Sequence, residues 1–165
     1  MTVTRNQPKM TVLKSLLFLI LVPGLLLGYF PYSIALSDIE VFESGILRYL
    51  AFPLWLIGAA GMLWCFWNFT FYGRGTPAPI DPPKELVAVG LYRFVRNPMY
   101  VSGILALLGW ILWSPSLPLI VAPFLFFIAA HLFVTLYEEP TLARKFGAAY
   151  EEYGRTVPRW IPRFK

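Results

Sequence analysis

The sequence reads GLYRFVRNPMY at positions 90–100, and from there it continues without a charge to residue 113. A second charged stretch, YEEP at positions 137–140, follows the last apolar segment of the chain. Charge at the border of a bilayer is costly unless another group pairs with it. We therefore expect the arginines of the first stretch and the glutamates of the second to share one side of a membrane, as a polar ligand site beside apolar helices.

Apolar residues dominate the composition of the chain. Of its 165 residues, 58% are hydrophobic and only 14% are charged, and the mean hydropathy is +0.61. Such a composition is typical of membrane proteins and not of a soluble domain with a polar surface. The net charge of +5 does not indicate nucleic-acid binding, because the basic residues flank apolar segments as topology determinants do. The length suits a single domain, residues 1–165.

Four apolar segments are long enough, or nearly so, to cross a hydrocarbon layer that takes about 20 helical residues. The sequence Ser-Pro-Ser at positions 114–116 predicts a tight turn, so that the last two helices form a hairpin. We thus predict an all-α polytopic membrane protein with four transmembrane helices, two in residues 1–72 and two in the motif-bearing region 73–165. The predicted spans are residues 15–36, 50–72, 99–113 and 117–137, of which the third is short.

The basic residues predict the orientation of these helices. With four spans, every Lys and Arg except Arg48 falls on one side of the membrane. The positive-inside rule makes that side cytoplasmic, with both termini inside. The first apolar segment follows basic residues, as a signal peptide does, but it is too long for one, and we expect an uncleaved spanning helix. The compact chain favours a bacterial inner membrane.

Two further segments flank the last two spans. Residues 73–89 are rich in Gly and Pro and predict an irregular loop, which suits a lid over a site and a plain connector equally well. After Pro140, apolar and aromatic residues recur at spacings of four, four and three, which predicts a helix lying in the cytoplasmic interface. These residues are Leu142, Phe146, Tyr150 and Tyr153.

Arg96, Asn97 and Pro98 allow two interpretations. Asn is a preferred N-cap and Pro is favoured at the first helical position, so a helix start with Arg96 as a topology anchor explains all three. The same helix start presents free N–H groups, and with Arg96 nearby it would hold a carboxylate or a phosphate. Spacing alone favours the capping interpretation.

Glu138, Glu139 and His131 lie near the end of the last predicted span. Adjacent carboxylates at the C-terminal end of a helix meet the unfavourable end of its dipole. Either Glu139 begins the tail helix while Glu138 pairs with an arginine, or both carboxylates bind a ligand. His131 lies on the same helix face as Glu138, where it either lines a polar pocket or hydrogen-bonds to a neighbouring helix. With one histidine and one cysteine in the chain, we expect no metal site.

Taken together, these motifs resemble the isoprenylcysteine carboxyl methyltransferase family, which includes bacterial relatives and the phospholipid methyltransferases. The resemblance covers roughly residues 74–165 and rests on an ordered set: the stretch at 90–100, His131, YEEP at 137–140 and VPRWIP at 157–162. It implies an integral-membrane enzyme that transfers a methyl group from S-adenosylmethionine. The implied cofactor pocket faces the cytoplasm, between the last spans and the tail, with a lateral opening for a lipid-like substrate.

The resemblance also implies roles for individual residues. The residues expected around the cofactor are Tyr92, Arg96, Asn97, Pro98, Tyr100, His131, Glu138 and Glu139. The expected catalytic residues are Arg96, Glu138 and Arg159, and Arg159 is expected to help hold the acceptor. In chemical terms the glutamates suit the ammonium or the ribose hydroxyls of S-adenosylmethionine, Arg96 suits its carboxylate, and a tyrosine ring suits adenine or the sulfonium.

The expected acceptor is an apolar, membrane-borne molecule, either lipid-like or prenylated. Carboxyl methyltransferases of the family usually have His where this chain has Asn97, whereas many phospholipid-type and bacterial members have Asn, so a phospholipid amine is the alternative acceptor. A carboxylate acceptor needs no base, but an amine must first lose a proton, for which a glutamate or His131 would serve. A third interpretation is a non-catalytic membrane scaffold or transport protein. The presence of Arg96 with both glutamates disfavours it.

Overall fold

The computed structural model describes residues 7–37, 41–74 and 83–163, with side chains from residue 12 onward. These residues form helices and contain no β-strand, as predicted. The elements, in chain order, are α1 (Gln7–Leu19), η1 (Ile20–Tyr29), α2 (Phe30–Ala35), η2 (Gly45–Leu50), α3 (Ala51–Phe71), η3 (Gly90–Arg93), α4 (Pro98–Trp113), α5 (Leu117–Phe133), η4 (Val134–Glu138), α6 (Glu139–Phe146) and α7 (Ala148–Thr156).

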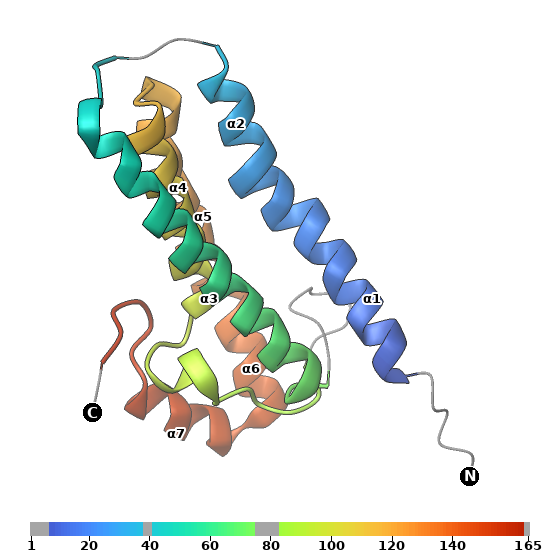
Figure 1. The fold of residues 1–165 in the computed structure, drawn as a ribbon. Helices are drawn as coiled ribbons and strands as arrows, with labels where there is room; N and C mark the ends of the chain where they lie inside the picture. Colours follow the sequence, from blue (N-terminus) through green and yellow to red (C-terminus); the bar gives the residue numbers. More distant parts are fainter. Residues whose placement is uncertain (1–6, 38–40, 75–82, 164–165) are drawn as a thin grey trace.

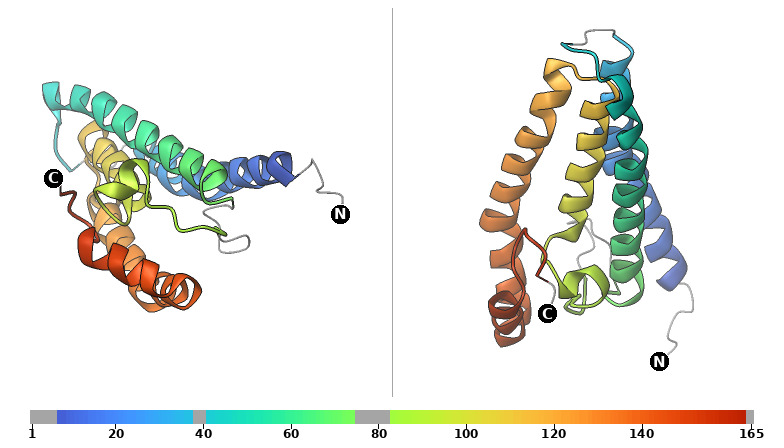
Figure 2. Two further views of the ribbon diagram at one scale, coloured as in Figure 1. Left: turned by 90° about the horizontal axis from the view of Figure 1, so that it is seen from below. Right: turned by 60° about the vertical axis from the view of Figure 1, so that its left-hand side comes forward.

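The first three elements form one continuous helical rod, drawn in blue (Figure 1). Its middle part, η1, is a π-helix that contains Pro23. A proline removes one backbone donor from a helix, and a wider π-helical stretch is one way in which a helix adapts to such a loss. The rod begins at the end of the molecule where α6 and α7 lie and ends at the opposite one (Figure 1, Figure 2).

Among the residues that the structure describes, three helices are long and apolar enough to cross a membrane, namely Val12–Ala35, Gly45–Phe71 and Leu117–Phe146. They correspond to the first, second and fourth predicted spans. The third, α4, is apolar but has 16 residues, which at 1.5 Å per residue reach about 24 Å. Most large apolar side chains of the three long helices are exposed, as expected where lipid is the solvent.

Close packing of α4 against α3 forms the centre of the helix bundle (Figure 2). A Cβ atom placed on Gly58 of α3 would lie 2.8 Å from the backbone oxygen of Ser102 in α4, so only glycine permits this approach. Small residues at helix contacts are typical of membrane proteins, because dispersion rather than the hydrophobic effect holds their helices together. This contact fixes α4, and with it the residues at its N-terminal end.

The helix that contains the fourth predicted span, residues 117–137, does not end at Tyr137. The helical run passes from α5 through the π-helical turn η4 into α6, so both glutamates lie inside a continuous helix. The prediction that the two carboxylates meet the unfavourable end of a helix dipole is therefore wrong. Pro140 is the second residue of α6, just after η4, where the altered hydrogen-bond pattern accommodates the missing backbone donor.

The predicted single tail helix is also wrong, because the tail forms two helices that are separated at Gly147. This residue has φ 54° and ψ −131°, a backbone conformation that is open essentially only to glycine. The break turns α7 back beneath the bundle, next to η3 (Figure 1). The 73–89 loop lies partly outside the described residues, so its expected role as a lid or a connector is not tested.

Candidate functional site

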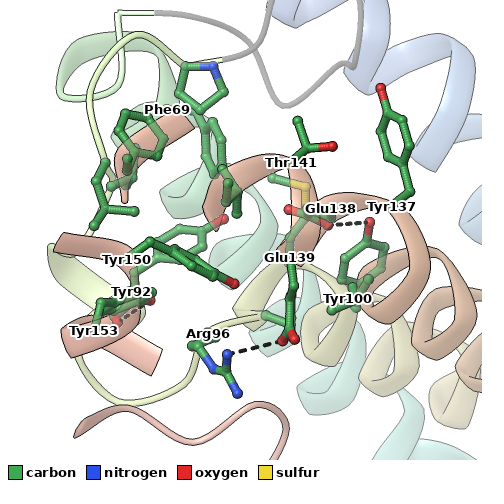
Figure 3. A pocket seen from close by; sticks show the side chains of 18 of the residues that line it. Phe69, Tyr92, Arg96, Tyr100, Tyr137, Glu138, Glu139, Thr141, Tyr150 and Tyr153 are labelled. Atoms are coloured by element: carbon green, nitrogen blue, oxygen red, sulfur yellow. Dashed lines mark hydrogen bonds and ion pairs between the residues drawn. The ribbon is translucent and has the colours of Figure 1, made fainter. Parts of the chain in front are cut away.

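A cavity of about 140 Å³ lies between the lower end of α3, the segment that precedes α4, and the helices from α5 to α7 (Figure 3). Its wall combines charged groups with many aromatic rings. The lining residues are Phe69, Pro83, Leu86, Val87, Tyr92, Arg96, Asn97, Met99, Tyr100, Phe133, Val134, Tyr137, Glu138, Glu139, Thr141, Leu142, Phe146, Tyr150 and Tyr153.

The segment that carries Arg96 and Asn97 is tied to the tail of the chain. The Arg96 backbone N–H donates to the Pro158 carbonyl at 2.8 Å, and the Asn97 Nδ2 donates to the Arg159 carbonyl at 3.0 Å. The Arg163 backbone N–H donates to the Phe94 carbonyl at 3.1 Å. The tail therefore runs beside this segment and fixes its path.

Asn97 precedes α4 and Pro98 begins it, so the predicted helix start is confirmed. The Asn97 side chain, however, makes no capping hydrogen bond to the helix, and its amide is used on the tail instead. The capping interpretation of this side chain is therefore wrong, although the position is that of an N-cap.

Glu139 is the carboxylate that pairs with arginine. Arg159 binds it in a bidentate manner, with Nε 2.7 Å from Oε1 and Nη2 2.8 Å from Oε2. Arg96 Nη1 lies 3.1 Å from the same Oε1 (Figure 3). The hydrogen bonds that Arg159 donates to Glu139 raise the pKa of Arg159 above its ordinary value. The alternative in which Glu138 pairs with an arginine is wrong, because Glu139 takes both.

Glu138 points into the other side of the cavity, toward α4. The Tyr100 hydroxyl donates to its Oε2 at 3.3 Å (Figure 3). Among the described residues Glu138 forms no ion pair with Lys or Arg, in contrast to its neighbour. It is thus a carboxylate with unused acceptor capacity at a cavity wall.

Three tyrosines close the cavity from η3 and α7. The Tyr153 hydroxyl donates to the Tyr92 carbonyl at 2.8 Å, which joins α7 to η3. Burial raises the pKa of Tyr92, Tyr150 and Tyr153 above the ordinary value of a phenol. All three hydroxyls therefore stay protonated at neutral pH.

The structure brings most of the expected site residues together around this cavity, but not all. Pro98, His131 and Arg159 are absent from its described lining. His131 Nδ1 accepts a hydrogen bond from Trp160 Nε1 at 3.1 Å, so its partner is the tail. Among the described residues, no three His, Cys, Asp or Glu side chains gather to hold a metal ion.

Sequence reasoning did not assign several cavity residues. Leu142, Phe146, Tyr150 and Tyr153 were expected on the apolar face of an interfacial helix, yet they line the cavity. Their shared periodicity was the signal, but the choice between membrane and cavity depends on the turn at Gly147. Phe69 carried no signal beyond apolar helix composition, whereas Tyr137 belongs to the YEEP motif but was given no role in the site.

The arrangement suits a small ligand that carries both signs of charge. Glu138 offers a carboxylate to a cation or to hydroxyl groups, and Arg96 offers a guanidinium to an anion. The aromatic rings offer faces to a planar or cationic group.

The family described as phospholipid methyltransferase matches residues 46–149 of the chain. An uncharacterized protein from Haemophilus influenzae is 35% identical over 63 residues, which are 38% of this chain and 100% of that protein. No solved structure matches the chain. The family match includes Arg96 and both glutamates, whereas Arg159 lies beyond it.

Proposed function

Because the chain belongs to the phospholipid methyltransferase family, we propose that it transfers a methyl group from S-adenosylmethionine to an apolar, membrane-borne acceptor. The observation that carries this proposal is the meeting of Arg96 and Glu138 at one cavity, at the end of apolar helices. Residues 1–165 would form a single methyltransferase domain, with residues 73–165 providing the cofactor site and residues 1–72 the first two spans.

The residues present fit S-adenosylmethionine. Arg96 lines the cavity, and its buried Nε has no hydrogen-bond partner among the described residues, so the guanidinium keeps a donor that no described protein group uses. Glu138 would take the ammonium or the ribose hydroxyls, with Tyr100 orienting its carboxylate. The rings of Tyr92 and Tyr150 would pack against adenine. When bound, S-adenosylmethionine supplies an electrophilic methyl group on a sulfonium.

The protein contributes position and proton handling. Methyl transfer is an in-line displacement, so holding the reacting atoms in line supplies much of the rate. Aromatic side chains from α3, η3, α4, α5, η4, α6 and α7 line the cavity, where they would keep water away from the reacting atoms. For an amine acceptor, Glu138 would accept the proton that the ammonium must lose before it can attack. A carboxylate acceptor would require no such step.

Two acceptor classes follow, a prenylcysteine-like carboxylate and a phospholipid amine. The description of the family favours the amine. Asn97 agrees with this preference. The carboxyl methyltransferases usually have a histidine at this position, whereas the Asn97 side chain has no imidazole and donates its amide to the Arg159 carbonyl in the tail.

We expect an integral membrane protein with four spans, in which α4 and α5 cross together as a hairpin. Support comes from Val41, whose backbone N–H donates to the Pro115 carbonyl at 2.8 Å and joins the two connections at the end opposite the cavity. The basic residues favour cytoplasmic termini and a cytoplasm-facing cavity in a bacterial inner membrane.

Purified protein in lipid nanodiscs tests the function. We expect S-adenosylhomocysteine to bind, and labelled methyl groups from S-adenosylmethionine to appear in phosphatidylethanolamine or in a prenylcysteine. Glu138→Gln should abolish both signals, whereas the matched surface variant Glu151→Gln should keep them. If folded protein binds no S-adenosylhomocysteine, the enzyme proposal fails and the scaffold interpretation takes its place.

A further inference from the structure

Two arginines share the Glu139 carboxylate at the cavity wall. Arg159 uses both Nε and Nη2 on it, at 2.7 Å and 2.8 Å, and Arg96 Nη1 lies 3.1 Å from Oε1. These are three charge-assisted contacts on two oxygens. Arginines thus use three of the roughly four acceptor positions of this carboxylate, so Glu139 is less well placed than Glu138 to bind a ligand cation.

The guanidinium of Arg96 pairs with Glu139 through Nη1 only. Its Nε is buried without a partner in the described part of the chain, and the side chain is 15% exposed and lines the cavity. Arg96 also packs against α7, because a Cβ atom placed on Gly154 would lie 3.4 Å from Nη1. A guanidinium held in this way, with an unpaired buried N–H, is prepared to bind an anion.

Arg159 reaches Glu139 because the tail is fixed independently of the ion pair. The carbonyls of Pro158 and Arg159 accept hydrogen bonds from the Arg96 backbone N–H and the Asn97 amide. Trp160 Nε1 donates to His131 on α5. Contacts with the Arg96–Asn97 segment and with α5 thus hold the tail so that Arg159 places a second positive charge beside Glu139. Arg159 lies beyond the residues matched to the family.

We propose that Glu139 and Arg159 are positioning residues, which do not touch the ligand. Arg159 neutralises Glu139, so that Arg96 pairs with this carboxylate through Nη1 alone and keeps other donors for the carboxylate of the methyl donor. This inference rests on the proposed function, which identifies the anion. Without Arg159, Glu139 would keep Arg96 as its one guanidinium partner. The attraction between the two, strengthened by partial burial, would then hold Arg96 away from the ligand.

The test is a double-variant cycle with two probes, read as dissociation constants in nanodiscs. S-adenosylhomocysteine has the carboxylate, and 5′-methylthioadenosine lacks the whole amino-acid part. Arg159→Ala should weaken S-adenosylhomocysteine binding by roughly tenfold or more, the effect of one charge-assisted hydrogen bond. Adding Glu139→Gln to this variant removes the competing charge and should restore the affinity to within about threefold of the wild type. Binding of 5′-methylthioadenosine should change by less than about twofold throughout, since Arg96 does not contact that probe.

The controls separate the possible failures. Arg155→Ala removes an exposed arginine whose carboxylate partners, Glu151 and Glu152, lie on the same helix, and it should leave both affinities unchanged. A variant that fails to fold loses both probes. If the wild type binds S-adenosylhomocysteine but the double variant does not regain affinity, the positioning role is wrong and the proposed function stands. The same conclusion follows if the single variant Glu139→Gln loses S-adenosylhomocysteine binding. Wild-type protein that binds neither probe would overturn the proposed function together with this inference.

Discussion

At the scale of single residues, Glu138 and Glu139 are neighbours in sequence with opposite surroundings. Glu139 pairs with two arginines, whereas Glu138 has a hydroxyl donor and no paired cation in the described structure. Burying a charge without a partner is costly, so Glu138→Gln should leave the free energy of unfolding unchanged or raise it. Glu139→Gln leaves two guanidinium groups without their carboxylate and should lower it by about 1–3 kcal/mol, less than for a fully buried pair.

Denaturant titration of both variants in one detergent measures this contrast. The opposite order, with Glu138→Gln the less stable of the two, would show that Glu138 has a structural partner. Ligand binding should show the opposite contrast, with the larger loss in Glu138→Gln, because Glu138 is the cavity carboxylate that no arginine pairs with in the described structure.

Tyr100 holds Glu138 through a single hydrogen bond of 3.3 Å. Tyr100→Phe keeps the ring and removes the donor, so it should weaken S-adenosylhomocysteine binding by roughly threefold to tenfold, the effect of one modest hydrogen bond to a charged group. Calorimetric titration gives the affinity. Tyr49→Phe, at an exposed tyrosine in η2, is the matched control and should have no effect. Equal affinities for wild type and Tyr100→Phe would exclude a role for this hydroxyl.

At the scale of elements, the turn between α6 and α7 decides which side chains close the cavity. Gly147→Ala meets no atom within 4 Å, so its effect comes only from the backbone at φ 54°. We expect the free energy of unfolding to fall by about 1–3 kcal/mol, with weaker ligand binding as Tyr150 and Tyr153 move. Gly28→Ala is the control, because a Cβ there also meets no atom and its φ is not positive. Similar effects from both variants would mean that the turn is unimportant.

The same turn explains what the sequence could predict and what it could not. Apolar length and periodicity predicted that the long helices exist, because burial in lipid depends on composition. The continuation of α5 into α6 was missed, since proline usually ends a helix and η4 cannot be read from local sequence. The direction of Tyr150 and Tyr153 depends on the backbone angles of Gly147, which composition does not reveal.

For the site, the sequence predicted that Arg96, Glu138 and Glu139 would lie on one side of the molecule, because charges at helix ends share the polar border. It did not predict which glutamate takes the arginines. That choice depends on the path of the tail. Two backbone hydrogen bonds fix this path, from Arg96 to Pro158 and from Arg163 to Phe94, and backbone hydrogen bonds cannot be predicted from the pattern of side chains.

At the scale of the whole molecule, the described elements have two distinct ends. The start of α1 and the helices α6 and α7 lie at one end, and the turn between α4 and α5 lies at the other (Figure 1, Figure 2). If the bundle spans a bilayer along this direction, α4 must cross in spite of its 16 residues. Its length of about 24 Å then requires the flanking residues or a thinned bilayer to complete the crossing.

Labelling of single introduced cysteines tests this topology. The native Cys65 is fully buried and should not react with a membrane-impermeant maleimide, so it can remain in place. Glu43→Cys and Leu117→Cys lie at exposed positions in the connection before η2 and at the start of α5, and Glu152→Cys lies on the exposed face of α7. With four spans and cytoplasmic termini, the first two should react in right-side-out membrane vesicles, and Glu152→Cys only in inverted ones, because the reagent cannot cross the bilayer. Reaction of Leu117→Cys from the same side as Glu152→Cys would mean that α4 does not cross. Reversal of all three would mean that the orientation inferred from the basic residues is wrong, while the four spans stand.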